Sequence, residues 1–176
     1  MIPSGRIDEV SEVEKFLALE KYLSGPPPVW RKPRWGGEYT ALWTMTDLAG
    51  EELAALKCTA QVTNTAVAGL NLIFRSRPVW RVHIDVDAAC HDNPHFADRL
   101  GLPGIVCGPH EHAWPINRDH ILAQDIWELP CRQSLAVKRL GVALAHLADQ
   151  INLTLTPEQR GFEGPTKSDL FDIGVV

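Results

Sequence analysis

The sequence predicts an α+β protein in which an antiparallel, strongly twisted sheet of five to six strands is flanked by an N-terminal helix and a long C-terminal helix. Three observations support this class. Apolar residues recur at helical spacing near the start of the chain, alternate with polar residues through its middle, and return to helical spacing after residue 132. A chain of 176 residues is long enough to bury a core, so we expect a single domain over residues 1–176.

The first predicted element is an amphipathic helix over residues 7–23, whose apolar side chains lie among acids and lysines. Its broad apolar face comprises Val10, Val13, Phe16, Leu17, Leu19 and Leu23. Gly25 and the three prolines after it end this helix, because proline lacks a backbone donor and restricts the residue before it.

A proline-rich connector follows over residues 24–37 and contains three cations between Trp30 and Trp35. One interpretation is an anion or single-stranded nucleic-acid contact, with Arg31, Lys32 and Arg34 on phosphates and the tryptophans stacking on bases. The other is a plain connection whose tryptophans fill the core while the cations stay in solvent. The density of prolines and glycines favours the plain connection.

Residues 38–129 are expected to form a β-rich core. The candidate strands cover residues 38–45, 56–63, 70–75, 79–86, 110–114 and a short edge segment at 125–129. In the clearest strand, Val79 to Val86, apolar residues share one face while Arg81, His83 and Asp85 share the other. An irregular loop is expected over 88–108. A helix over 132–151 and a packed or partner-binding tail over 152–176 complete the chain.

The composition excludes several classes of protein. A net charge of −5, from 22 acids and 17 bases, argues against a large general nucleic-acid surface, although a local basic segment remains compatible. No apolar run reaches the ~18 residues needed to span a bilayer, so we expect no membrane partner. The N-terminus lacks an apolar signal core, which favours a cytoplasmic location. The four cysteines are therefore interpreted as thiols or metal ligands, and the oligomeric state stays open.

Six of the seven histidines fall between His83 and His120, and histidine is both a proton-transfer group and the commonest metal ligand. Two histidines at i and i+2 on a strand project to the same side, so His110 and His112 can reach one ion. With His91 or His95 as a third ligand, water would take the fourth position, as in catalytic zinc sites.

Three other interpretations of this cluster stay open. Cys90 and Cys107 could join His91 or His95 and His110 in a closed structural site. A metal-free site could use His83, His91 and His110 as acid and base on a phosphodiester. The histidines could also serve only as hydrogen-bonded loop residues.

The segment from Asn93-Pro94 through Gly108-Pro109-His110-Glu111-His112 to Asn117 resembles small uncharacterised proteins of bacterial and phage genomes that carry a similar Asn-Pro … Gly-Pro-His-x-His segment. The resemblance covers about 35 residues. It implies no specific activity. An origin in a mobile element would favour a toxin nuclease or an inhibitor of a host protein.

The leading functional expectation is a metal-assisted hydrolase acting on a phosphodiester of RNA or DNA, with zinc as the favoured metal. Asp85 or His83 would orient or deprotonate water, and Arg118 and Arg81 would neutralise the phosphate. The alternative is a non-enzymatic protein that binds and inhibits a host protein, with the His/Cys cluster structural. In that case Trp30 and Trp35 would contribute to the binding surface.

Overall fold

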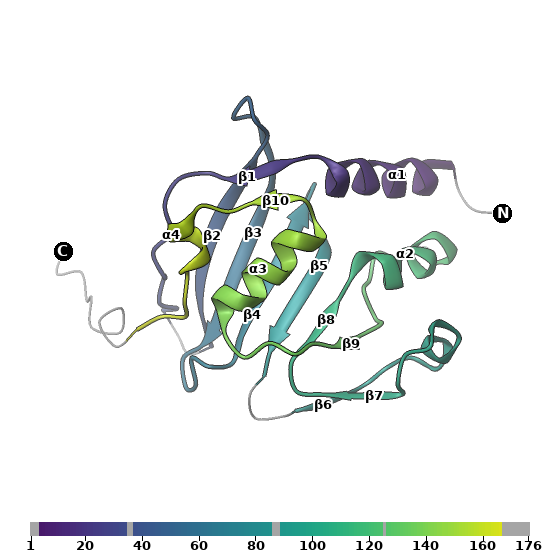
Figure 1. Ribbon diagram of the computed structural model, residues 1–176. Helices are drawn as coiled ribbons and strands as arrows, with labels where there is room; N and C mark the ends of the chain where they lie inside the picture. Colours follow the sequence, from purple (N-terminus) through teal and green to yellow (C-terminus); the bar gives the residue numbers. More distant parts are fainter. Residues whose placement is uncertain (1–3, 35–36, 86–88, 125, 167–176) are drawn as a thin grey trace.

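The computed structural model describes residues 4–34, 37–85, 89–124 and 126–166 and shows an α+β fold built on a large, mostly antiparallel sheet of eight strands (Figure 1). The strand order is β10-β1-β2-β3-β4-β5-β8-β9, and only the β1–β10 pair is parallel. The strands of this sheet are β1 (Lys21–Leu23), β2 (Glu38–Thr46), β3 (Glu52–Gln61), β4 (Ala68–Phe74), β5 (Arg77–Ile84), β8 (His110–His112), β9 (Gln133–Ser134) and β10 (Leu153–Thr154).

The expected five to six strands were too few. The main four, β2 to β5, form an antiparallel meander close to the predicted positions, although β3, β4 and β5 begin two to four residues earlier than predicted. The predicted edge strand at 125–129 is not formed by its described residues, 126–129. The additional members β1, β9 and β10 are two or three residues long. A period of two residues cannot be recognised in so short a segment, and each is instead held by a neighbouring strand.

The two faces of the sheet differ in exposure. Leu56 and Cys58 of β3 are buried, whereas the alternating Lys57 and Thr59 are only half-buried. Helix α3 (Leu140–Gln150) packs against β4 and β5 on the buried face and closes the core with Leu144. The opposite face carries polar side chains and leads to the histidine cluster.

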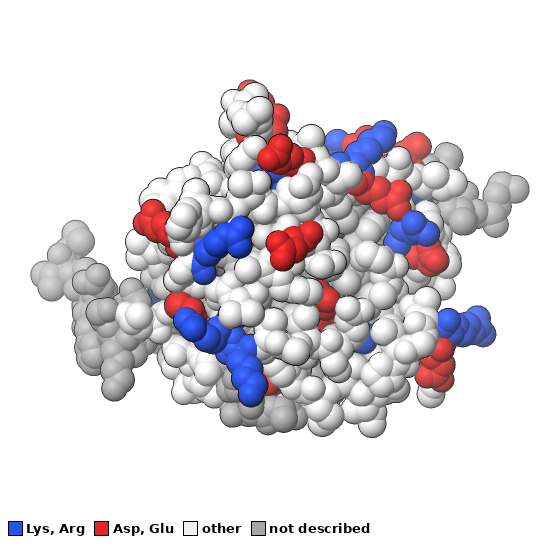
Figure 2. All heavy atoms as spheres, in the orientation of Figure 1, with Lys and Arg blue, Asp and Glu red and all other residues white. Residues whose placement is uncertain are grey.

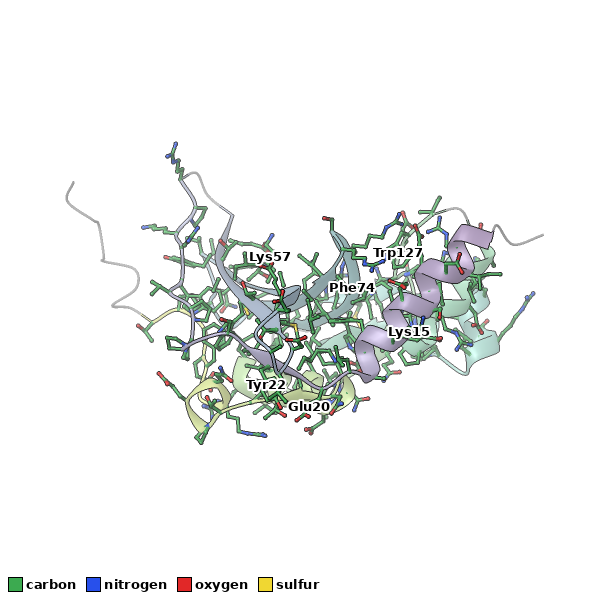
Figure 3. The ribbon with its side chains drawn as sticks, turned by 90° about the horizontal axis from the view of Figure 1, so that it is seen from above. Lys15, Glu20, Tyr22, Lys57, Phe74 and Trp127 are labelled. Atoms are coloured by element: carbon green, nitrogen blue, oxygen red, sulfur yellow. A yellow bond between two sulfur atoms is a disulfide. The ribbon has the colours of Figure 1, made fainter. Side chains whose placement is uncertain are left out.

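The N-terminal helix α1 covers Ser4–Ala18, and the expected final turn at 21–23 is strand β1 instead. Phe16 of α1 stacks on Phe74 with ring centroids 4.4 Å apart, and Figure 3 shows Phe74 and Trp127 beside this helix. The helix stops because Lys21 folds back and donates from Nζ to the carbonyls of Leu17 and Leu19, at 3.0 and 2.6 Å, and to that of Ile151. Lys21 is fully buried, so its ammonium group links the end of α1 to the C-terminal half of the chain.

The expected helix over 132–151 is shorter than predicted, because Gln133 and Ser134 pair with β8 as strand β9. The predicted tail contains strand β10 and helix α4 (Pro157–Arg160), which begins with a capping box between Thr156 and Gln159. A helix that the sequence analysis did not predict, α2 (Trp114–Ala123), follows β8 directly.

In the connector, Trp30 is buried and stacks on Phe162, with ring centroids 5.4 Å apart, as the plain-connection interpretation expects. Trp35 lies outside the described residues. On the face that α3 covers, acidic and basic side chains are interspersed among uncharged ones (Figure 2). Within the described ranges, no helix has both the length and the apolar character required to cross a bilayer.

Lys21→Met keeps the apolar stem but removes the donors, leaving the buried carbonyl of Ile151 and the part-buried carbonyls of Leu17 and Leu19 without this partner. We expect the free energy of unfolding to fall by about 3 kcal/mol, measured by urea denaturation at pH 7. The matched control Lys15→Met changes an exposed lysine on α1 and should cost less than about 0.5 kcal/mol. Equal losses in the two variants would contradict this assignment.

Candidate metal centre

The antiparallel pairing of β5 with β8 assembles three histidines on one side of the sheet. His83 lies directly opposite His110, and Arg81 lies opposite His112. Because side chains at i and i+2 share a face, all three imidazoles project to the same side. The His83 ring stacks on that of His110 with centroids 5.0 Å apart and meets that of His112 edge-on at 5.4 Å.

One ring nitrogen from each of His83, His110 and His112 lies within 4.8 Å of the others, the arrangement of a potential metal site. Around a tetrahedral zinc ion with Zn–N bonds of about 2.05 Å, ligand nitrogens are about 3.3 Å apart. The three rings therefore need to converge by about 1.5 Å at most to hold an ion. Small changes of side-chain torsion can provide such a shift.

Two backbone carbonyls select the tautomer of the buried histidines. His110 Nδ1 lies 2.8 Å from the carbonyl oxygen of Gly108, and His112 Nδ1 lies 2.5 Å from that of Leu129. A carbonyl only accepts hydrogen bonds, so each Nδ1 carries the proton and each Nε2 keeps its lone pair. Metal-binding histidines are oriented by this kind of second hydrogen bond.

Desolvation and positively charged neighbours keep the three imidazoles neutral near pH 7. Desolvation lowers the pKa of His112 to about 3 and that of His83 to about 4, and it also lowers the pKa of His110. The neighbouring histidines and the positive charge of Arg132 act on these pKa values in the same direction. His110 and His112 are almost fully enclosed, whereas His83 is exposed on its outer side. A neutral imidazole is the form that binds a metal ion.

The carbonyls that hold the histidines are themselves fixed. Gly108 has a φ of 73°, a left-handed conformation that glycine adopts without strain at the turn into β8. Asn117 of α2 is fully buried and accepts from the Cys131 N–H at 2.8 Å while donating to the carbonyls of Cys131 and Ala113.

Asn93 binds the backbone of Arg132, the residue after Cys131, in the same way. Its side chain accepts from the Arg132 N–H at 2.7 Å and donates to the carbonyls of Arg132 and Pro103, both at 2.8 Å. Two asparagines therefore hold the backbone of Cys131 and Arg132, which directly follows the segment that supplies the Leu129 carbonyl. Both asparagines belong to the run from Asn93 to Asn117-Arg118 that carries the resemblance described above.

A hollow of about 200 Å³ opens beside the histidines. Its lining includes His83 and His110, together with Asp85, His91, Thr59 and Glu38. A small molecule can thus approach the cluster at His83, which is exposed. His112 is buried and cannot be approached from the solvent.

The structure brings together only part of the predicted ligand set. His83, expected to act on water, belongs with His110 and His112 in place of the expected third ligand. His91 lies next to this group, with its ring centroid 4.9 Å from that of His110. His95 is exposed at the start of the 3-10 helix η1 (His95–Leu100), apart from the three.

Cys90 and Cys107 form a disulfide, which differs from the expected thiols or thiolate ligands. They are register partners in the two-stranded sheet of β6 (Cys90–Asp92) and β7 (Ile105–Cys107). Oxidised sulfurs cannot act as thiolate ligands, so in this form the pair does not complete a structural zinc site. The bond instead fixes the hairpin that carries His91.

The expected phosphate-binding arginine Arg118 lies elsewhere, because its guanidinium is bound to Glu14 of α1 and to Asp119, each at 3.0 Å. Arg132 is the cation that affects all three histidines. Sequence reasoning missed Arg132, which immediately precedes β9, the strand that pairs with β8. The predicted anion-binding residues Arg31, Lys32 and Arg34 are exposed in the connector.

Glu111 points to the opposite face, as the strand pattern predicts, and is 2% exposed there. It accepts from Trp80 Nε1 at 2.8 Å and from Gln133 Nε2 at 3.0 Å, and its Oε2 lies 3.1 Å from His146 Nε2. These contacts satisfy the carboxylate within the core. Glu111 therefore does not reach the hollow beside the three histidines.

Comparisons with protein-family models, with curated proteins and with solved structures found no match for this chain. The site is therefore assigned from its own geometry.

The pKa directions predict an acid-sensitive fold in metal-free protein. Unfolded histidines titrate near 6.5, whereas His83 and His112 in the folded state accept protons only near pH 4 and 3. Between pH 6.5 and about 4 the unfolded chain therefore binds more protons, so the free energy of unfolding falls as the pH falls. Urea denaturation across this range measures the effect.

The double variant His110→Asn/His112→Asn is the control, because an asparagine amide can donate to the same carbonyls but does not titrate. Its free energy of unfolding should depend less steeply on pH than that of the wild type. The same pH dependence in both proteins would contradict the neutral, buried state of these histidines.

Proposed function

We propose that this protein is a metal-dependent hydrolase in which His83, His110 and His112 hold a zinc ion. The supporting observation is the convergence of three neutral imidazoles, with His83 exposed to a hollow while the other two are enclosed. Catalytic zinc sites use three protein ligands and leave one position for water, whereas structural sites are closed by four. Within the described residues, these three histidines have no fourth protein ligand at comparable distance.

Zinc at such a site supplies Lewis acidity and lowers the pKa of water toward 7. The protein contributes orientation: the carbonyls of Gly108 and Leu129 hold His110 and His112 with Nε2 available. Asp85 and His91 line the same hollow and are the side chains placed to accept a proton from water.

A phosphodiester is the proposed substrate class. Arg81 lies opposite His112 in the strand register, and Arg132 lies near enough to shift the pKa of every histidine in the cluster. Guanidinium groups bind the paired oxygens of a phosphate and stabilise the charge that grows on them during hydrolysis. Arg81 and Arg132 take the role that the sequence suggested for Arg81 and Arg118.

Metal content and turnover test the proposal together. Protein purified without an affinity tag should hold about one zinc ion per chain by mass spectrometry. His110→Asn/His112→Asn should lose it while keeping the two carbonyl hydrogen bonds. Zinc-loaded wild type should accelerate hydrolysis of bis(p-nitrophenyl) phosphate over its uncatalysed rate more than it accelerates that of p-nitrophenyl acetate, and the variant should lose at least about a hundredfold in kcat/KM.

The outcomes separate the alternatives. Absence of bound metal in folded wild type, even after dialysis against zinc, would contradict the proposal. Tight zinc binding without turnover of either ester would instead favour a structural metal in a host-protein inhibitor. Preference for the carboxylic ester would retain the hydrolase and exclude the phosphodiester.

Asn117 should act as a positioning residue for the metal. Asn117→Ala removes three hydrogen bonds, two of them to the backbone of Cys131, and so loosens the segment that holds the Leu129 carbonyl against His112. We expect zinc affinity to fall by about 10- to 100-fold, measured by competition with a chromophoric chelator. The free energy of unfolding should fall by about 3 kcal/mol.

Gln124→Ala, at an exposed position that ends the same helix, is the matched control and should change neither quantity. A loss of stability in Asn117→Ala with unchanged zinc affinity would show that Asn117 supports the fold alone. Asn117→Asp, which keeps the acceptor for the Cys131 N–H, should recover part of the affinity.

A further inference from the structure

The polar face of the sheet, opposite α3, carries two rows of side chains that lead across the strands to the histidines. Cross-strand pairing defines both rows from β2 to β8. The first row contains Thr40, Thr59, Gly69, His83 and His110. The second row contains Leu42, Lys57, Asn71, Arg81 and His112. Figure 3 shows Lys57 on the side of the sheet away from α3.

Three adjoining hollows follow these rows. The first, of about 560 Å³, lies between the connector and β2–β3 and is lined by Arg31 and Lys57. The second, of about 200 Å³, shares Lys57 and extends to Arg81 and His83. The third, also about 200 Å³, shares His83 and is the hollow beside the metal site. Together they form a groove from the connector to the histidines.

Gly69 lies between the second hollow and His83. A Cβ at this position would lie 3.2 Å from the carbonyl oxygen of Val82 and 3.3 Å from Thr59 Oγ1, closer than side chains normally pack. Because Gly69 has no side chain, nothing at this position fills the groove where the groove approaches the histidine cluster.

The cations of this groove have no acidic partner. Of the residues that the structure describes, none forms an ion pair or a side-chain hydrogen bond with Arg31, Lys57 or Arg81. By contrast, Arg75, Arg77, Arg118 and Arg139 are all paired with carboxylates. The first two hollows are therefore cationic in a chain whose net charge is −5, whereas the third hollow is lined by the carboxylates Glu38 and Asp85. Glu38, which also lines the second hollow, lies at the start of β2.

Two buried polar atoms on the floor are without hydrogen-bond partners. Arg81 Nε and Asn71 Oδ1 are both enclosed, and their residues are register partners on neighbouring strands. A buried polar atom without a partner costs about 1–3 kcal/mol, so such atoms indicate a site that a ligand or water completes. A phosphate oxygen can accept from Arg81 Nε, and a base N–H or a water can donate to Asn71 Oδ1.

We propose that this groove binds single-stranded nucleic acid, with Arg31, Lys57 and Arg81 on the phosphates and the strand leading to His83. The cleavage of that strand rests on the proposed hydrolase, but its binding does not. Lys57 and Arg81 lie two strands apart, roughly 10 Å, a spacing that a flexible strand can follow along a narrow groove. The two rows contain no Phe, Tyr or Trp, so contacts to the backbone should dominate and sequence preference should be weak.

The test is fluorescence anisotropy with a labelled 12-nucleotide oligo(dT), in buffer containing a chelator so that no metal-dependent cleavage occurs. Wild type should bind, and Lys57→Gln/Arg81→Gln should bind at least tenfold more weakly at 50 mM salt. Removing two phosphate contacts should reduce the slope of log K against log salt by about 1.4. Arg99→Gln/Lys138→Gln removes two exposed cations outside the groove and should match the wild type.

A second variant is needed in case the first variant does not fold. Arg31→Gln/Lys57→Gln leaves the unpartnered Arg81 untouched and should show the same loss of affinity. Equal binding by the groove and control variants, or no binding by wild type, would overturn the proposal. So would a 12-base-pair duplex that binds as tightly as the single strand. The zinc content of the groove variants should equal that of wild type, so failure of the metal site and failure of the groove are distinguishable.

Discussion

The pairing of β5 with β8 is the constraint on which the candidate site depends. It places His83 opposite His110 and leaves His112 one step along the same face. Two hydrogen bonds from imidazole Nδ1 to backbone carbonyls then determine which nitrogen of each buried ring is available. The strand pairing brings the three histidines close together, and the carbonyls orient the rings of His110 and His112. A metal site needs both.

The surrounding structure maintains this arrangement at a cost to stability. Burying His110 and His112 as neutral rings favours metal binding but makes the folded state sensitive to acid. Asn93 and Asn117 offset this by fixing the segment from Leu129 to Arg132 through side-chain bonds to its backbone. The same polar face that exposes His83 continues into the cationic groove, so one sheet surface would serve both metal and substrate.

Much of the sheet could be predicted from the sequence because long alternating segments define β2 to β5. The i, i+2 spacing likewise placed His110 and His112 on one side, with Glu111 opposite. What could not be predicted is which strands are neighbours: His83 and His110 are 27 residues apart in sequence, and no local pattern sets their register. The same holds for the disulfide between Cys90 and Cys107, which depends on the β6–β7 pairing. Arg132 was missed because its role comes entirely from tertiary contacts.

In the proposed site, His83, His110 and His112 present free ring nitrogens to one metal ion. Long-range ¹H–¹⁵N NMR of protein with ¹⁵N-labelled histidine at pH 7 tests this arrangement most directly, because the ring nitrogen shifts report both tautomer and metal coordination. We expect His110 and His112 to carry their proton on Nδ1 without metal, and one equivalent of ¹¹³Cd²⁺ to couple to a nitrogen of each of the three rings. Nε2–H tautomers at His110 and His112, or coupling that omits His83, would contradict this arrangement.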